Sequence, residues 1–112
     1  MEIIQEQAPD IYGVKFVAKD NGKEVGRSFL YVLKNDLHEE PFGFIEDVFV
    51  DEKYRGKGLG KQLVQAVIEE AKKFRCYKLI CTSRHSGDAH EFYKKFGFKD
   101  HGKEFRMDFQ KE

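Results

Sequence analysis

The sequence predicts an α/β protein of the α+β kind, in which a mixed, mostly antiparallel sheet carries two helices. Two observations predict this class. In the first half of the chain, apolar and polar residues alternate in runs rich in Val, Ile, Phe and Tyr, which is typical of strands. In the second half, apolar residues return every three or four positions in two segments, which is typical of helices that pack on a core. These periods give the order β-β-β-α-β-α-β.

Three strands are expected in the first half, at residues 12–18, 25–33 and 42–50. The pair Asn21-Gly22 lies between the first two strands, and this pair is typical of a tight hairpin turn. The first half is therefore expected to be an antiparallel meander.

One helix is expected after residue 58, because Leu59, Leu63 and Val67 fall on one face of a helical period. The short apolar segment 76–82 is expected to be a strand. A strand, a helix and a strand in this order predict a parallel crossover within one sheet.

The end of the chain is expected to hold a second helix over residues 87–97 and a closing strand over residues 104–109. Gly97 is placed to end this helix, because glycine takes the left-handed conformation that helix ends need. With 112 residues and nothing that resembles a linker, the chain is expected to be one domain over residues 1–112.

The composition excludes several classes of function. The 20 basic residues balance the 20 acidic ones, which argues against a general nucleic-acid or membrane binder. The first residues lack the pattern of a signal peptide, and Cys76 and Cys81 are spaced like ordinary reduced thiols. We therefore expect a cytoplasmic protein. His85, His90 and His101 do not have the spacing of metal ligands, so no metal is expected.

The glycine-rich segment "RGKGLGK" lies between the third strand and the first helix. A helix N-terminus presents unpaired N–H groups, and glycines before it let an anion approach them closely, so the segment predicts a phosphate or pyrophosphate site. The Walker pattern fails, because Arg55 stands where its first glycine should be and Gln62 where Ser or Thr should be. The dinucleotide pattern GxGxxG fails as well, because the first strands form a meander and the spacing does not fit.

The pattern that fits is R-x-x-G-x-G, and with it the sequence resembles the GCN5-related N-acetyltransferases (the GNAT family). A second segment, "DAHEFYKKFGFKDHG", is similar to another signature of this family. The resemblance implies acetyl-CoA as co-substrate and a sheet that splays open between two central strands. It implies that the coenzyme is bound by the backbone of one central strand, by the amides of the glycine loop, by a residue after the next strand and by a helical tyrosine: Val48, Phe49, Val50, Arg55, Gly56, Lys57, Gly58, Leu59, Gly60, Lys61, Ser86 and Tyr93.

Three glycines have separate expected roles in this loop. Gly58 and Gly60 are expected to clear space for the pyrophosphate. Gly56 stands at a variable position of the pattern and is expected to tolerate alanine better.

Two residues are candidates for acid and base in the transfer of an acetyl group to an amine. By resemblance, Tyr93 is the general acid that protonates the leaving thiolate; the alternative is a core aromatic residue of an amphipathic helix. Glu46 is the candidate base, acting through water, because polyamine acetyltransferases of this family carry a similar Glu-Asp pair; the alternative is a solvated sheet face. Strand alternation is expected to point Asp47 to the opposite face.

The chain departs from the family on the acceptor side. Members usually carry two helices after the first strand, whereas only Asn21-Gly22 separates the first two long strands here. The acceptor is expected to be a small-molecule amine or a peptide amine, and a second subunit could complete its site, so a homodimer is a hypothesis. Two other functions stay open: a non-catalytic acetyl-CoA-binding module, and a small phosphate- or nucleic-acid-binding domain.

Overall fold

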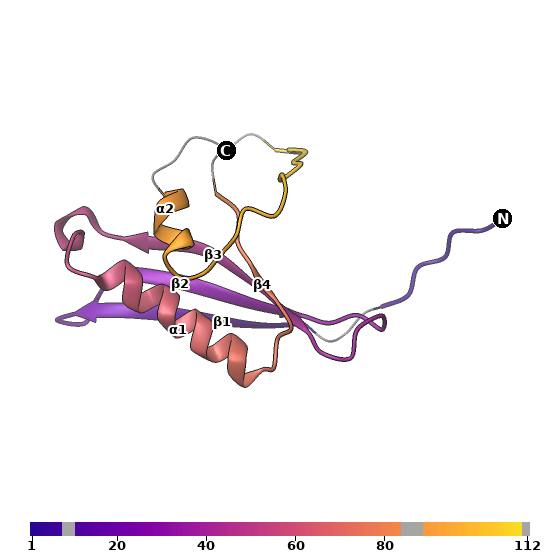
Figure 1. Cartoon of the computed structure of the whole chain (residues 1–112), viewed down its shortest axis with the longest axis horizontal. Helices are drawn as coiled ribbons and strands as arrows, with labels where there is room; N and C mark the ends of the chain where they lie inside the picture. The colour runs from indigo at the N-terminus through magenta and orange to yellow at the C-terminus, as the bar shows by residue number, and fades with distance from the viewer. Residues whose placement is uncertain (8–10, 84–88, 111–112) are drawn as a thin grey trace. The chain divides into compact units, whose positions relative to one another are not determined.

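Three long strands form an antiparallel meander at the start of the chain (Figure 1). They are β1 (Ile11–Asp20), β2 (Lys23–Leu33) and β3 (Phe42–Val50), and a two-residue β4 (Leu79–Ile80) completes the sheet in the order β1-β2-β3-β4. The computed structural model describes residues 1–7, 11–83 and 89–110. The mixed sheet confirms the expected fold class, and β1 and β2 are joined by a tight turn with no helix between them.

The chain divides into two compact units, Met1–Cys81 and Thr82–Glu112. The first unit holds the sheet, the 3-10 turn η1 (Glu52–Tyr54) and the helix α1 (Leu59–Lys73). The second unit holds the short helix α2 (Ala89–Lys94). One domain over residues 1–112 stays a prediction.

The core of the first unit lies between α1 and one face of the sheet, as Figure 1 shows. Leu30 of β2 and Val64 and Val67 of α1 are fully buried there. Ser28 is also fully buried, and its hydroxyl donates a hydrogen bond to the carbonyl oxygen of Leu63 at 3.2 Å. A buried hydroxyl needs such a partner, and this bond ties β2 to the helix backbone.

The sheet opens along β3, because β4 is much shorter than the expected strand 76–82. Only two residue pairs join the parallel strands, Gly43↔Leu79 and Phe44↔Ile80. Beyond Phe44, β3 pairs only with β2 among the described strands, through Ile45, Glu46, Phe49 and Val50. This is the splay between two central strands that the sequence resemblance implies.

The second unit differs from the expectation at its end. The helix is confirmed over Ala89–Lys94, and Gly97 has the left-handed φ of 100° that was expected of a helix end. The closing strand over residues 104–109 is wrong, since these residues form no strand and are exposed. Phe105, Met107 and Phe109 have the alternation of a strand, but no described strand pairs with them, and alternation without a pairing partner does not make a strand.

Replacing Gly43 with Ala is expected to destabilise the fold by about 1–3 kcal/mol, the usual range for overpacking a core. A Cβ atom at Gly43 would lie 2.9 Å from Leu79 Cδ1 and 3.1 Å from Leu30 Cδ1. Because Gly43 pairs with Leu79, the crowding acts where β3 and β4 meet. Urea denaturation measures the change. Gly102→Ala is the matched control, since nothing lies within 4 Å of a Cβ there; equal losses in both variants would contradict the packing argument.

Candidate active site

A bulge in β3 determines which side chains share a face of the sheet. On β2, Arg27 pairs with Phe49 and Phe29 pairs with Glu46, so two steps on β2 match three on β3. Asp47 lies in the extra step with φ of 50°, a left-handed conformation that is uncommon for a residue other than glycine. The bulge therefore changes the alternation of β3 at Asp47.

This bulge interrupts the simple alternation on which the expected face of Asp47, opposite to Glu46, was based, and it also changes which residues share the face of Glu46. Paired residues lie on the same face, and Arg27 and Phe29 share a face because β2 is regular between them. Glu46 and Phe49 therefore lie on one face, although they are three residues apart. That face is opposite to the one that α1 covers, because Leu30 and Ile45 are a buried pair on the α1 side. Glu46 is exposed, so its carboxylate is solvated.

The open edge of β3 ends at Val50 with polar backbone groups that face away from β2. The Asp51 N–H donates to the Val25 carbonyl at 2.8 Å, so Asp51 is a hydrogen-bonded partner of β2. In an antiparallel ladder, the N–H and C=O groups of consecutive residues point to opposite sides of the strand. The backbone groups of Val50 therefore point away from β2. The Val50 carbonyl accepts a hydrogen bond from Arg55 Nε at 2.8 Å. The Arg55 side chain thus closes the end of the open edge.

The glycine loop leads from this edge into α1. Gly56 and Gly58 have left-handed φ angles of 78° and 83°, and Gly58 is the N-cap of the helix. Nothing lies within 4 Å of a Cβ at either position, so the backbone conformation, not crowding within the chain, requires glycine there. The expectation that Gly56 tolerates alanine needs revision, because a left-handed alanine costs about 1–2 kcal/mol. Gly60 is the second residue of α1, so its backbone is helical.

The N-terminus of α1 supplies unpaired amides at the end of the loop. Gln62 N–H donates to the Gly58 carbonyl at 3.1 Å, which is the first hydrogen bond of the helix. The N–H groups of Leu59, Gly60 and Lys61 precede that bond and have no partner within the helix. Their position at the positive end of a 15-residue helix suits an anion.

Contacts that the sequence did not suggest hold this loop to the sheet. The Tyr54 hydroxyl of η1 donates a hydrogen bond to the Asp20 carboxylate at the β1–β2 turn, and this bond raises the pKa of Tyr54. The guanidinium groups of Arg27 and Arg55 lie 4.7 Å and 5.8 Å from the ring centre of Phe49. Only the register of β2 and β3 places Arg27 next to Phe49, because Arg27 is 22 residues before Phe49 in the sequence.

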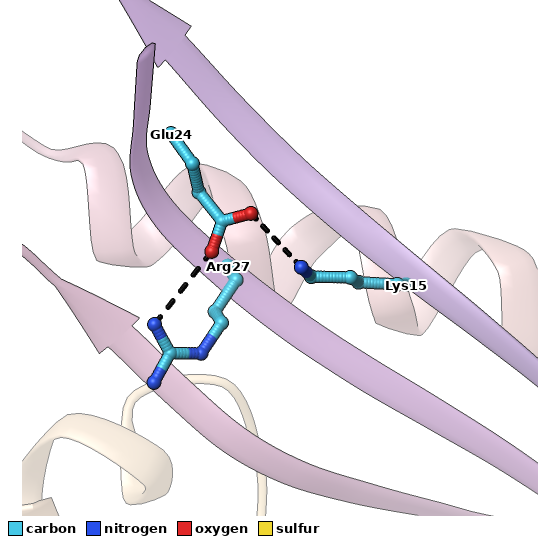
Figure 2. A network of polar contacts seen from close by, with 3 residues as sticks. All are labelled: Lys15, Glu24 and Arg27. Carbon is cyan, nitrogen blue, oxygen red and sulfur yellow. Dashed lines mark hydrogen bonds and ion pairs between the residues drawn. The ribbon is translucent and has the colours of Figure 1, made fainter.

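Arg27 also belongs to a small polar network on the exposed sheet face (Figure 2). Figure 2 shows Glu24 between Lys15 of β1 and Arg27 of β2, with Lys15 Nζ at 2.9 Å from Glu24 Oε1 and Arg27 Nη1 at 3.7 Å from Glu24 Oε2. The hydrogen bond from Lys15 lowers the pKa of Glu24. The carboxylate is therefore ionised at neutral pH, and the three groups together carry one positive charge.

Tyr93 belongs to α2 in the second unit. Its ring makes edge contacts with the rings of Phe92 and Phe98 at centroid distances of 5.3 Å and 5.7 Å, and it is half-buried. Glu46, Val48–Val50 and the loop residues 55–61 belong to the first unit. Ser86, also expected at the coenzyme, lies outside the described residues.

Residues 1–7, 11–83 and 89–110 hold neither a metal-binding cluster nor a membrane-spanning helix. No group of three or more His, Cys, Asp or Glu side chains in these ranges is arranged to hold a metal ion. None of the helices there combines the length and the apolar character that a membrane crossing requires.

Comparison with known proteins agrees with this geometry. The chain is 38% identical over 94 residues to a glucosamine 6-phosphate N-acetyltransferase of Trypanosoma brucei brucei, which covers 83% of this chain and 63% of that protein. It is 36% identical over 72 residues to a spermine/spermidine N(1)-acetyltransferase of Bacillus subtilis, which covers 62% of this chain and 45% of that protein. The chain thus spans less than two thirds of the length of these relatives.

Structural comparison gives the same family. A solved structure of glucosamine-6-phosphate N-acetyltransferase from Arabidopsis thaliana superposes with a TM-score of 0.81 at 30% identity, covering 88% of this chain and 67% of that one. The model of the acetyltransferase (GNAT) family matches residues 2–98. With a match over most of its length, this chain belongs to the GNAT family of acetyltransferases.

Proposed function

We propose that this protein is an acetyl-CoA-dependent N-acetyltransferase that transfers the acetyl group directly to a primary amine. The observation that carries the proposal is the open edge of β3, which is followed, after the short turn η1, by the glycine loop and the N-terminus of α1. Acetyl-CoA has two parts that suit these features in the same order: a pantetheine arm with amides, and a pyrophosphate.

The backbone of Val48, Phe49 and Val50 would bind the pantetheine arm, because an unpaired strand edge accepts an amide-bearing ligand much as it accepts a peptide. Asp47 in the bulge leaves backbone groups outside the ladder, which adds polar partners near the thioester end. The amides of residues 55–61 would bind the pyrophosphate, with Lys57 and Lys61 adding positive charge.

In the proposed reaction, the amine nitrogen attacks the acetyl carbon, a C–N bond forms and the C–S bond breaks. The protonated amine must first lose one proton, which passes through water to the Glu46 carboxylate. After the attack the nitrogen loses a second proton, which restores the Tyr93 hydroxyl once that group has protonated the thiolate. Exposure of Glu46 to solvent supports a route through water. The leaving thiolate takes a proton from the hydroxyl of Tyr93, since a phenol of pKa near 10 can donate to a developing thiolate.

A screen of amines with acetyl-CoA tests this function. Amino sugars, their phosphates, polyamines and peptide amines are each incubated with the protein, and released thiol is measured. We expect thiol release above the rate without protein for at least one class of amine, with formation of the acetylated amine.

The absence of a helix between β1 and β2 favours one alternative, a module that binds acetyl-CoA without turnover. Calorimetry separates the two functions. Binding of acetyl-CoA with no thiol release from any amine would support the module, and absence of acetyl-CoA binding would contradict both.

A further inference from the structure

We propose that Arg27 binds an anionic group of the amine acceptor and so selects acceptors that carry a phosphate or a similar anion. This inference rests on the proposed acetyl transfer with Glu46 on the base side. The inference favours the acceptor named for the glucosamine 6-phosphate N-acetyltransferases over the one named for the spermine/spermidine acetyltransferase. A sugar phosphate carries an anion, whereas a polyamine carries only positive charges.

The register of β2 and β3 puts Arg27 and Glu46 on one surface, and the bulge in β3 brings Phe49 to it as well. Arg27 pairs with Phe49 and Phe29 pairs with Glu46, so all four side chains lie on the face opposite to α1. In a strand without a bulge, Arg27 would still share the face of Glu46, but Phe49 would lie on the opposite face.

The spacing on this surface fits an acceptor of limited length. Arg27 and Phe29 are two residues apart, which corresponds to about 7 Å along a strand. Glu46 lies opposite Phe29 on the neighbouring strand, so Arg27 is its diagonal neighbour at about 7–8 Å. An amine near Glu46 and an anion at Arg27 would thus be separated on the scale of one sugar ring with its phosphate arm. The surface therefore fits an amino sugar phosphate.

The charge around Arg27 favours an anion. Its guanidinium lies 4.7 Å from the centre of the Phe49 ring, and its Nη1 atom lies 3.7 Å from Glu24 Oε2. Glu24 is shared with Lys15, so one carboxylate serves two cations. Arg55 brings a further guanidinium to within 5.8 Å of the same ring centre.

The guanidinium of Arg27 is also prepared for binding. The Phe49 ring and Glu24 limit its freedom, and 37% of the side chain stays exposed. A guanidinium has five N–H donors in a planar fork, which suits a phosphate with two parallel hydrogen bonds. A single carboxylate at 3.7 Å cannot use all of these donors.

Arg27→Gln tests the proposal, with Arg75→Gln as the matched control. Arg75 is also an exposed arginine paired with a glutamate, Glu40, but Glu40 precedes the start of β3, at the end of the sheet away from Arg27. Binding of glucosamine 6-phosphate and of glucosamine is measured by calorimetry on protein saturated with coenzyme A, so the test does not need turnover. Binding of acetyl-CoA is measured separately, and circular dichroism checks that each variant is folded.

We expect Arg27→Gln to raise the Kd of glucosamine 6-phosphate by about tenfold or more, which corresponds to about 1.4 kcal/mol. The preference of the protein for the phosphorylated amine over glucosamine should fall by the same factor. The Kd of acetyl-CoA, and the preference in Arg75→Gln, should change by less than about twofold, as expected for exposed charges at a distance.

Three results would overturn the proposal. The wild-type protein could bind both amines equally or bind neither, Arg27→Gln could keep the preference for the phosphorylated amine, or acetyl-CoA binding could weaken by the same factor as the amine. The last result would assign Arg27 to a phosphate of the coenzyme. The Arg27 proposal is tested by binding, whereas the proposed acetyl transfer is tested by thiol release in the screen. The absence of thiol release would therefore contradict the proposed function and is a separate result.

Discussion

Tyr93→Phe is expected to slow acetyl transfer by about 10²–10⁴-fold, the usual contribution of a general acid or base. The substitution removes only the hydroxyl. The ring contacts with Phe92 and Phe98 depend on the aromatic ring, so the variant should keep them. Without a proton donor, the thiolate leaves as an anion, and the barrier for breaking the C–S bond rises.

Single-turnover kinetics with acetyl-CoA and an accepted amine measure this effect, and calorimetry measures coenzyme binding. We expect the Kd of acetyl-CoA to stay within about twofold, because a general acid acts mainly in the transition state. Tyr77→Phe is the control, since Tyr77 is an exposed tyrosine that stacks on His38 in the first unit. An unchanged rate in Tyr93→Phe would remove the general-acid role.

Gly60→Val is expected to abolish acetyl-CoA binding, with a loss of at least about 100-fold, or about 2.7 kcal/mol. Gly60 lies in the first turn of α1, where the unpaired amides are expected to meet the pyrophosphate. A branched side chain at this position would keep the phosphates away from those amides.

The fold itself should tolerate this change. The backbone of Gly60 is helical, and valine is a better helix former than glycine by a few tenths of a kcal/mol. The melting temperature should therefore not fall. Gln65→Val, at an exposed position further along α1, controls for valine in the helix and should keep the affinity for acetyl-CoA. If both variants bind the coenzyme as the wild type does, the pyrophosphate is not bound at this turn.

The sheet shows where reasoning from sequence succeeds and where it stops. The meander and α1 were predictable because hydrophobic period, Asn21-Gly22 and the start of the helix are local signals. The prediction of a closing strand over residues 104–109 was wrong. The alternation of apolar residues there is a local signal, whereas a strand also needs a second strand to pair with, which the local sequence does not reveal. The length of β4 was overestimated for the same reason, as only Leu79 and Ile80 pair with β3.

The candidate site divides in the same way. The glycine loop and Tyr93 could be singled out because each belongs to a contiguous pattern. Asp20 and Arg27 could not, because Tyr54 and Phe49, their partners, lie on segments that only folding brings close. The face of Glu46 relative to Phe49 could not be derived either, because a bulge depends on the register of two strands.

The sequence by itself determined the family, the order of the elements as far as α2 and the place of the glycine loop between β3 and α1, because those depend on residue type and spacing along the chain. The tertiary structure decided how far β3 stays open, that Gly56 and Gly58 are required by left-handed backbone, and that Arg27, Phe49 and Glu46 share one surface. Those features depend on strand register, and register is set by packing between distant segments and the bulge at Asp47, which no local pattern encodes.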